Sequence, residues 1–141
     1  MKYYAVIDTN VLVSGLLKQG SLPWEIINLC MENTIVPLLN DEIIEEYIEV
    51  CKRNKFGFDP NYVDSIIKLL VEKSILLERI SADETLTDEG DVVFYEIVLS
   101  ARKAEDAYLV TGNLKHFPKR KYIVTPKEMI EIIYKNFNSK N

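Results

Sequence analysis

Apolar and polar residues follow one another along this 141-residue chain in blocks that predict strands separated by helices. Continuous apolar and β-branched runs bounded by polar turns predict buried strands, at residues 3–7, 34–39, 76–80, 107–111 and 122–124. Apolar residues spaced three and four apart predict helices, at residues 11–17, 23–33, 41–54, 91–103 and from 126 onwards. A further helix is opened by Asp59-Pro60 and carries apolar residues at helical spacing as far as Val71. Strands that alternate with helices build a parallel sheet covered on both faces, so we expect a three-layer α/β/α fold.

The chain has the length of one domain. No repeat, linker or low-complexity stretch divides residues 1–136, which we expect to form a single domain followed by a flexible tail at 137–141. The longest apolar run is too short to cross a bilayer, and no signal peptide precedes the first strand. We therefore expect a cytoplasmic protein that has no membrane partner and in which Cys30 and Cys51 are buried thiols.

The first predicted strand ends on a carboxylate, Asp8, which is followed by Thr9 and Asn10. Open α/β sheets bind their ligands beyond the carboxyl ends of the strands, which makes Asp8 a candidate for chemistry. Aspartate, threonine and asparagine also cap helices, and a short helix is predicted next. This segment alone leaves both interpretations open.

The predicted helix at 41–54 carries a second candidate, Glu46. At about 100° per residue its apolar side chains form one arc, made of Ile43, Ile44, Tyr47, Ile48, Val50 and Cys51. Glu46 lies at the margin of this arc beside Val50, so its carboxylate can lean toward the sheet edge. An exposed helical glutamate is the alternative.

Two acids precede the inward stripe of the predicted helix at 91–103. That stripe consists of Phe94, Ile97, Val98 and Ala101. Three residues back it reaches Asp91, and a further three back it reaches Asp88. Acids at a helix start cap free N–H groups and suit the helix dipole. An inward carboxylate is nevertheless costly unless it meets a cation, which favours a functional interpretation of Asp91.

The predicted strand at 107–111 ends in Thr111-Gly112-Asn113, which offers a hydroxyl and an amide at the same sheet edge as Asp8. Gly112 permits a tight exit from the strand, and a plain turn is the alternative. Acids that converge on one edge suit hard cations such as Mg²⁺ or Mn²⁺. The single His116 and two distant cysteines cannot build a zinc site.

The net charge of −5 argues against a broad electrostatic contact with nucleic acid. It does not exclude a nuclease, because an acidic centre can hold a phosphodiester through metal ions. Basic residues gather near the C-terminal end, at Lys115, His116, Lys119, Arg120 and Lys121. This basic segment is either a solvated loop or a contact for a phosphate backbone.

Together these motifs resemble the PIN domain, and in particular the PIN-family toxins of prokaryotic toxin–antitoxin systems. The resemblance covers almost the whole chain and rests on Ile7-Asp8-Thr9-Asn10-Val11-Leu12, Glu45-Glu46-Tyr47, Asp88-x-x-Asp91, Leu109-Val110-Thr111-Gly112-Asn113 and Ile123-Val124-Thr125-Pro126. It implies an α/β/α fold around a parallel sheet and a Mg²⁺- or Mn²⁺-dependent ribonuclease. An antitoxin protein and a second copy of the chain are the implied partners besides RNA.

The resemblance also implies roles for individual residues. The acidic, metal-binding centre falls on Asp8, Glu46 and Asp91, with Asp88 as an extra ligand. Asn113 stands where the commonest family pattern has an aspartate, so it would offer a neutral oxygen and hold a second metal less tightly. Hydrogen bonds that hold the carboxylates are expected from Thr9, Asn10 and Thr111. Contacts to RNA are expected from Lys115, His116, Lys119 and Arg120.

Two other functions stay open from the sequence. A phosphatase of the haloacid dehalogenase class also begins with a strand that ends in aspartate, but its second aspartate would fall on Asn10. A catalytically silent binding module is the stronger alternative because of Asn113. A homodimer could use Leu22 and Trp24, unless Trp24 belongs to the core.

Overall fold

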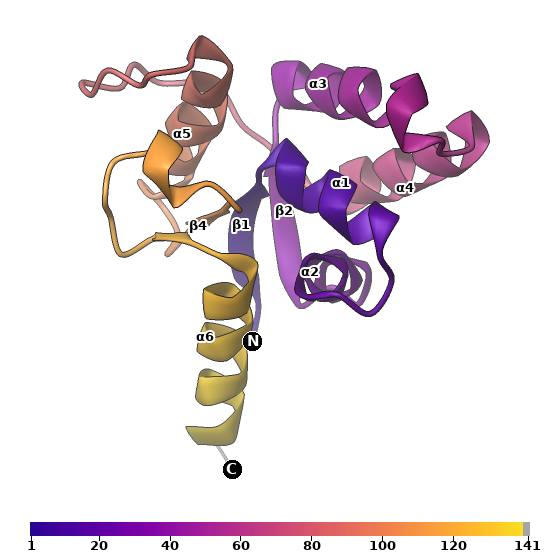
Figure 1. Cartoon of the computed structure of the whole chain (residues 1–141). Helices are drawn as coiled ribbons and strands as arrows, with labels where there is room; N and C mark the ends of the chain where they lie inside the picture. The colour runs from indigo at the N-terminus through magenta and orange to yellow at the C-terminus, as the bar shows by residue number, and fades with distance from the viewer. Residues whose placement is uncertain (140–141) are drawn as a thin grey trace.

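The computed structural model describes residues 1–139, and its centre is a five-stranded sheet in which every pairing is parallel (Figure 1). The strand order is β3-β2-β1-β4-β5. The strands are β1 (Tyr3–Ile7), β2 (Ile35–Leu39), β3 (Ile75–Leu76), β4 (Tyr108–Val110) and β5 (Ile123–Val124). The predicted α/β fold with a parallel sheet is therefore confirmed.

The central strand, β1, lies at the point where the strand order reverses. Ala5 pairs with Pro37 of β2 on one side and with Tyr108 of β4 on the other. From β1 the chain moves outward to β2 and β3, and it then returns to β4 and β5 on the opposite side. Such a switch point leaves a crevice outside the carboxyl ends of the two central strands. Asp8 and Thr111, which follow β1 and β4, stand at this crevice.

Helices cover the sheet on both faces. α5 packs on β1, β2 and β4, whereas α2 and α4 pack on β2 from the opposite face (Figure 1). α1 lies against α2 and α3, and α6 lies against α2 and β5. The helices are α1 (Thr9–Leu17), α2 (Leu22–Met31), α3 (Asp41–Cys51), α4 (Pro60–Lys73), α5 (Glu89–Ala101) and α6 (Pro126–Ser139), with short 3₁₀ turns η1 (Asn54–Phe56) and η2 (Leu114–His116).

The apolar residues predicted to face inward are all buried in α5 but only partly buried in α3. All four apolar residues predicted to face inward from α5 are buried. In α3 only Ile43, Tyr47 and Cys51 are buried, and Ile48 is exposed. The arc is narrower than predicted because α3 touches α1, α4 and α5 rather than lying flat on the sheet. Cys51 is a free buried thiol, as is Cys30.

Two predicted segments end differently in the structure. The third strand was predicted at 76–80, but β3 contains only Ile75 and Leu76, and the chain then leaves the sheet. The flexible tail was predicted at 137–141, but α6 continues to Ser139; residues 140–141 lie outside the described residues. Polar residues lower helix propensity by only about 0.5 kcal/mol each, so a helix anchored by its buried face continues through them.

No helix within residues 1–139 has the length and apolar character needed to cross a membrane. The cytoplasmic location stays a prediction.

α1 and α2 approach each other closely at Gly15. A Cβ atom there would lie 2.5 Å from Cδ1 of Ile27 and 3.0 Å from the carbonyl oxygen of Pro23. The Ile27 side chain can turn away, but the backbone oxygen cannot. We expect Gly15→Ala to lower the free energy of unfolding by about 1–2 kcal/mol, because overpacking outweighs the gain in helix propensity. Urea denaturation measures this loss.

Ser14→Ala is the control for this substitution, because Ser14 is the exposed neighbour in the same helix. A surface change of this kind should alter stability by about 0.5 kcal/mol or less. A Gly15→Ala protein that is more stable than the wild type would contradict the close approach of α1 and α2.

Candidate active site

Asp8 is a buried carboxylate at the end of β1, with 6% of its surface exposed. Its backbone occupies the N-cap position of α1, but its side chain makes no capping hydrogen bond. Instead, Oδ2 accepts a hydrogen bond from the Thr111 hydroxyl at 2.7 Å and a longer one from the Asn10 amide at 3.3 Å. The capping interpretation is therefore wrong for the side chain of Asp8, which is held at the end of β4.

Burial is the largest cause that raises the pKa of Asp8, and the charge of Asp91 raises it further. The hydrogen bond from Thr111 acts in the opposite direction, but the pKa stays above its ordinary value. A buried carboxylate near a like charge is unfavourable when it is ionised. Ionisation of the Asp8 carboxyl is therefore less favourable in the folded protein than in the unfolded chain, which points to a role for this carboxylate other than stability.

The segment after β4 is fastened to the segment after β1. The backbone N–H of Gly112 donates to Oδ1 of Asn10 at 3.2 Å, and the N–H of Asn113 donates to the Thr111 hydroxyl at 3.0 Å. Asn10 thus links Asp8 with Gly112, and Thr111 links Asp8 with Asn113. The side chain of Asn113 is exposed and makes no hydrogen bond to the carboxylates described below.

Two hydrogen bonds of opposite direction join α3 to the corner between β1 and α1. The Thr9 hydroxyl donates to the carboxylate of Glu46, and the hydroxyl of the next residue, Tyr47, donates to the carbonyl of Ile7. Tyr47 is 1% exposed, so its hydroxyl needs a partner inside the protein. Sequence reasoning placed Tyr47 in the core without this role. The available signal was a tyrosine in a buried arc, which predicts a hydrogen bond but not its partner.

The start of α5 brings two more carboxylates to the same edge. Oδ1 of Asp88 accepts a hydrogen bond from the N–H of Gly90 at 2.8 Å, so Asp88 caps the helix. Asp91 lies in the first turn, and its Oδ2 is 3.2 Å from Nδ1 of His116 in η2. A Cβ atom built on Gly90 would lie 3.9 Å from Oε1 of Glu46, which shows that α3 approaches α5 here.

These four carboxylates, which we call the acidic cluster, influence one another electrostatically. Burial is the main cause that raises the pKa of Glu46, and the charges of Asp8 and Asp88 add to it. Burial likewise raises the pKa of Asp91, followed by the charges of Asp88 and, more weakly, Glu46, while His116 lowers it. The structure thus brings Asp8, Glu46, Asp88 and Asp91 together from three separate elements.

The carboxylates of the acidic cluster do not all point toward one common position. Within residues 1–139, no group of three or more His, Cys, Asp or Glu side chains has an arrangement that could hold a metal ion as it stands. Glu46 is turned toward Thr9, and Asp91 is turned toward His116. Their metal-binding roles stay predictions.

The raised pKa of Asp8 gives a pH dependence that can be measured on metal-free protein. The folded state holds this proton more tightly than the unfolded state, so ionisation of Asp8 disfavours folding. Below its ordinary pKa of 3.8 the carboxyl is protonated in both states. As the pH rises through the raised pKa, the wild type should lose stability relative to Asp8→Asn.

Urea denaturation in EDTA, from about pH 3 to about pH 8, measures this difference in the free energy of unfolding. The difference in the free energy of unfolding between the wild type and Asp8→Asn should appear above the ordinary pKa of Asp8 and become constant above its raised pKa. A wild type that is more stable than Asp8→Asn near neutral pH would contradict the unfavourable burial of Asp8.

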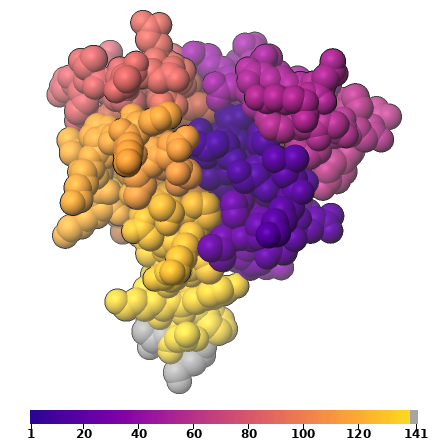
Figure 2. Space-filling model, viewed as in Figure 1, coloured from indigo at the N-terminus to yellow at the C-terminus, as the bar shows by residue number. Residues whose placement is uncertain are grey.

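Two clefts are lined in part by residues of η2. One, of about 410 Å³, is lined by Thr87, Asp88, Glu89 and His116. The other, of about 420 Å³, is lined in part by Lys115, Lys119 and Arg120. Figure 2 shows the segment around η2, in orange, beside α5, in salmon, as the contact between His116 and Asp91 requires.

The predicted RNA contacts therefore divide into two groups. Lys115 and Lys119 are exposed, with their charges toward solvent. His116 contacts Asp91, and Arg120 contacts Glu84 at 3.3 Å and the carbonyl of Lys119 at 2.9 Å. Arg120 and His116 thus have protein partners that the sequence did not predict.

Comparison with known proteins agrees with this geometry. A sequence model of the PIN domain matches residues 4–115, which contain all but the first residue of β1, the whole of β4 and all four members of the acidic cluster. The chain is also 27% identical over 146 residues to "Uncharacterized protein MJ1680" of Methanocaldococcus jannaschii, with 93% of this chain and 92% of that protein covered. No solved structure gives a significant match. PIN domains are in general nucleases, which supports a hydrolase. The protein belongs to the PIN domain family.

Proposed function

We propose that this protein is a Mg²⁺- or Mn²⁺-dependent ribonuclease that hydrolyses RNA phosphodiester bonds at the acidic cluster. The observation that carries this proposal is the burial of Asp8 at the switch point of the sheet, beside carboxylates whose charges raise one another's pKa. In the folded protein, ionisation of such clustered carboxylates is unfavourable unless a cation is bound. Membership of the PIN domain family also favours a nuclease.

The donor set suits a hard divalent cation, because every member offers carboxylate oxygens. Glu46 and Asp91 would have to turn from Thr9 and His116 toward Asp8 to share the ion, and the charge of the cation would offset the repulsion among the three carboxylates. Asp8 and Asp91 are the proposed ligands. Glu46 would be a ligand or would orient a bound water, and Asp88 would be an additional ligand.

When bound, the cation would activate a water molecule and neutralise charge that develops on the phosphate. The chain's own residues prepare this site. Thr111 and Asn10 hold Asp8 in one orientation, and Thr9 limits the movement of Glu46. Asn113 would add an uncharged amide oxygen beside the cluster.

RNA would approach along η2, because the basic segment begins next to the acidic cluster. His116 contacts Asp91 directly, while Lys115 and Lys119 are exposed for phosphate contacts. Arg120 would contribute only if it left Glu84. Contacts of this kind position the phosphate backbone without reading sequence.

Cleavage of mixed RNAs tests this function. We expect the purified protein to cleave them with Mn²⁺ or Mg²⁺ and to stop when EDTA is added. Cleavage that persists in EDTA would refute metal dependence. An acyl-phosphate trapped on Asp8 would instead support the phosphatase, which family membership now disfavours.

The silent binding module remains a competing proposal because of Asn113. We expect Asn113→Asp to tighten Mn²⁺ binding by about tenfold, since a fifth carboxylate joins the four hard oxygen ligands of the acidic cluster. Isothermal titration calorimetry measures this affinity, and Asn61→Asp, which adds the same charge at an exposed position of α4, is the control. An Asn113→Asp protein that neither binds metal nor cleaves RNA would favour the silent module.

A toxin role, an antitoxin partner and a homodimer are further proposals that rest on the resemblance. Leu22 is 48% exposed, whereas Trp24 is half-buried against the core, so only part of the proposed dimer surface is open. Light scattering at high protein concentration tests the dimer, and a monomer would contradict it.

A further inference from the structure

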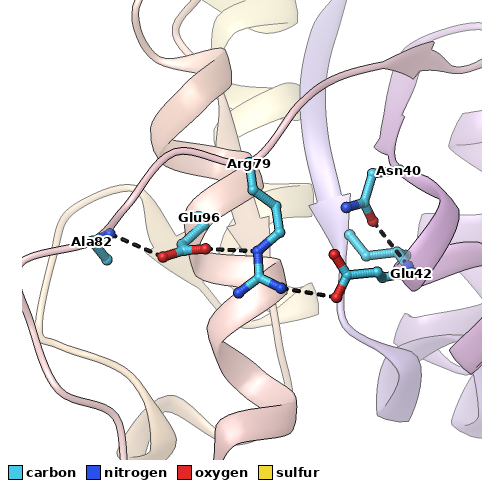
Figure 3. A network of polar contacts seen from close by, with 6 residues as sticks. Asn40, Glu42, Arg79, Ala82 and Glu96 are labelled. Atoms are coloured by element: carbon cyan, nitrogen blue, oxygen red, sulfur yellow. Dashed lines mark hydrogen bonds and ion pairs between the residues drawn. The ribbon is translucent and has the colours of Figure 1, made fainter.

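One arginine joins the two helices that carry most of the acidic cluster. Arg79 follows β3, and its Nη1 lies 2.8 Å from Oε2 of Glu42 on α3 (Figure 3). Its Nε lies 2.7 Å from Oε1 of Glu96 on α5. Within residues 1–139, no other cationic side chain forms ion pairs with both α3 and α5.

The two arms of this contact differ in exposure. The Glu96 side chain is 12% exposed, whereas that of Glu42 is 55% exposed. Oε2 of Glu96 also accepts a hydrogen bond from the N–H of Ala82 at 3.0 Å, so Glu96 holds the loop after β3 at two points. Burial acts to lower the pKa of Arg79, but the bonds to Glu96 and Glu42 outweigh it, so the guanidinium stays charged.

The position of Glu42 connects this contact with the acidic cluster. Glu42 and Glu46 are four residues apart on α3 and therefore lie on the same face of the helix. Asn40 caps α3 by accepting from the N–H of Ile43 at 2.9 Å, which fixes the turn that contains Glu42. A shift of α3 relative to α5 would move Glu46 away from Asp91.

Charge supplies a reason for such a shift. The carboxylates of Glu46 on α3 and Asp91 on α5 repel each other when both are ionised. Arg79 attracts one carboxylate on each of the same two helices, so it opposes their separation. Two of its nitrogens bind protein carboxylates, so we assign the guanidinium to the contact between the helices and not to a substrate phosphate.

We propose that Arg79 is a positioning residue that sets the separation between Glu46 and Asp91 and thereby tunes metal affinity. Arg79 touches none of the reacting atoms. The inference rests on the proposed function in one respect, namely that the acidic cluster binds a divalent cation.

Arg79→Gln tests this role through metal binding. The exposed pair with Glu42 contributes little to stability, but loss of the pair with Glu96 leaves a carboxylate that is only 12% exposed without its cation, so the substitution should lower the melting temperature measurably without unfolding the protein. We expect Mn²⁺ affinity, followed by electron paramagnetic resonance, to weaken by about tenfold, as for other residues that orient metal ligands. With saturating Mn²⁺, kcat should recover toward the wild-type value, which a general loss of folding would not allow.

Arg53→Gln is the matched control, because Arg53, just after α3, pairs at 2.8 Å with Glu49 on α3 and forms no ion pair with α5. It should bind Mn²⁺ like the wild type. If the wild type binds Mn²⁺ and Arg79→Gln binds it as tightly as Arg53→Gln does, the inference is overturned. If the wild type itself binds no Mn²⁺, the proposed function fails, and the link from Arg79 to metal affinity falls with it.

A metal-free measurement tests the contact between the helices by itself. Spin labels at Glu45→Cys on α3 and Lys103→Cys, just after α5, report the distance between the helices. Cys30 and Cys51 are buried, and burial raises the pKa of Cys30 to about 12 and of Cys51 to about 11, so they should escape labelling. Arg79→Gln should broaden or lengthen the distance distribution, and Arg53→Gln should not. An unchanged distribution overturns the inference whatever the metal result.

Discussion

Asp8→Asn is expected to reduce RNA cleavage by about a hundredfold or more while the fold stays intact. The substitution removes one charge with little change of shape, and the asparagine oxygen can still accept the hydrogen bond from Thr111. Loss of a metal ligand removes several kcal/mol of transition-state stabilisation, and about 1.4 kcal/mol corresponds to a tenfold change in rate. Single-turnover cleavage of a labelled RNA with Mn²⁺ measures the loss.

Asp64→Asn provides the control for the loss of charge. Asp64 lies on α4, where its 55% exposed side chain pairs with Lys52. We expect this variant to cleave RNA at the wild-type rate. Circular dichroism of both variants should match the wild type. An Asp8→Asn protein that keeps more than about a tenth of the wild-type cleavage rate would contradict a catalytic role for Asp8.

Mn²⁺ is expected to raise the melting temperature of the wild type by roughly 5–10 °C. A ligand at about a hundredfold excess over its Kd stabilises the folded state by about 2.7 kcal/mol. For a chain of this size, about 1 kcal/mol corresponds to roughly 2–4 °C. The rise should be larger when the acidic cluster is ionised, because the cation then cancels the repulsion among its members.

Differential scanning calorimetry at millimolar Mn²⁺ measures this shift, with EDTA as the reference. Asp8→Asn should lose most of the rise, while Asp64→Asn should keep it. No rise in the wild type, together with equal melting of Asp8→Asn with and without metal, would make the silent module the better account of this chain.

The positions of candidate site residues could be predicted from the sequence where they depend only on the end of a strand or the spacing of a helix. Asp8 could be placed at a sheet edge because it ends a buried strand, and Asp91 because it continues the inward stripe of α5 by one turn. These predictions use only strand ends and helical spacing. The same spacing overestimated the buried arc of α3, since it cannot show that α3 touches its neighbours along one stripe.

Contacts between distant residues could not be predicted in this way. The bonds of Arg79 to Glu42 and Glu96 span 37 and 17 residues. With 17 basic and 22 acidic residues in the chain, charge alone allows a very large number of such pairs. The bond from Tyr47 to the Ile7 carbonyl depends on how α3 meets β1, which follows from packing and not from local sequence. Helix propensity likewise failed to show how far α6 continues.

The hydrogen bond between Asp8 and Thr111 limits when Asp8 can reach its final position during synthesis. These residues are 103 positions apart, so the contact closes most of the chain into a loop at a cost in chain entropy, and it cannot form before Thr111 has been synthesised. During synthesis, all four acids leave the ribosome before Thr111 does. The nascent chain therefore carries the complete set of charges for some time before β4 pairs with β1 and fixes Asp8.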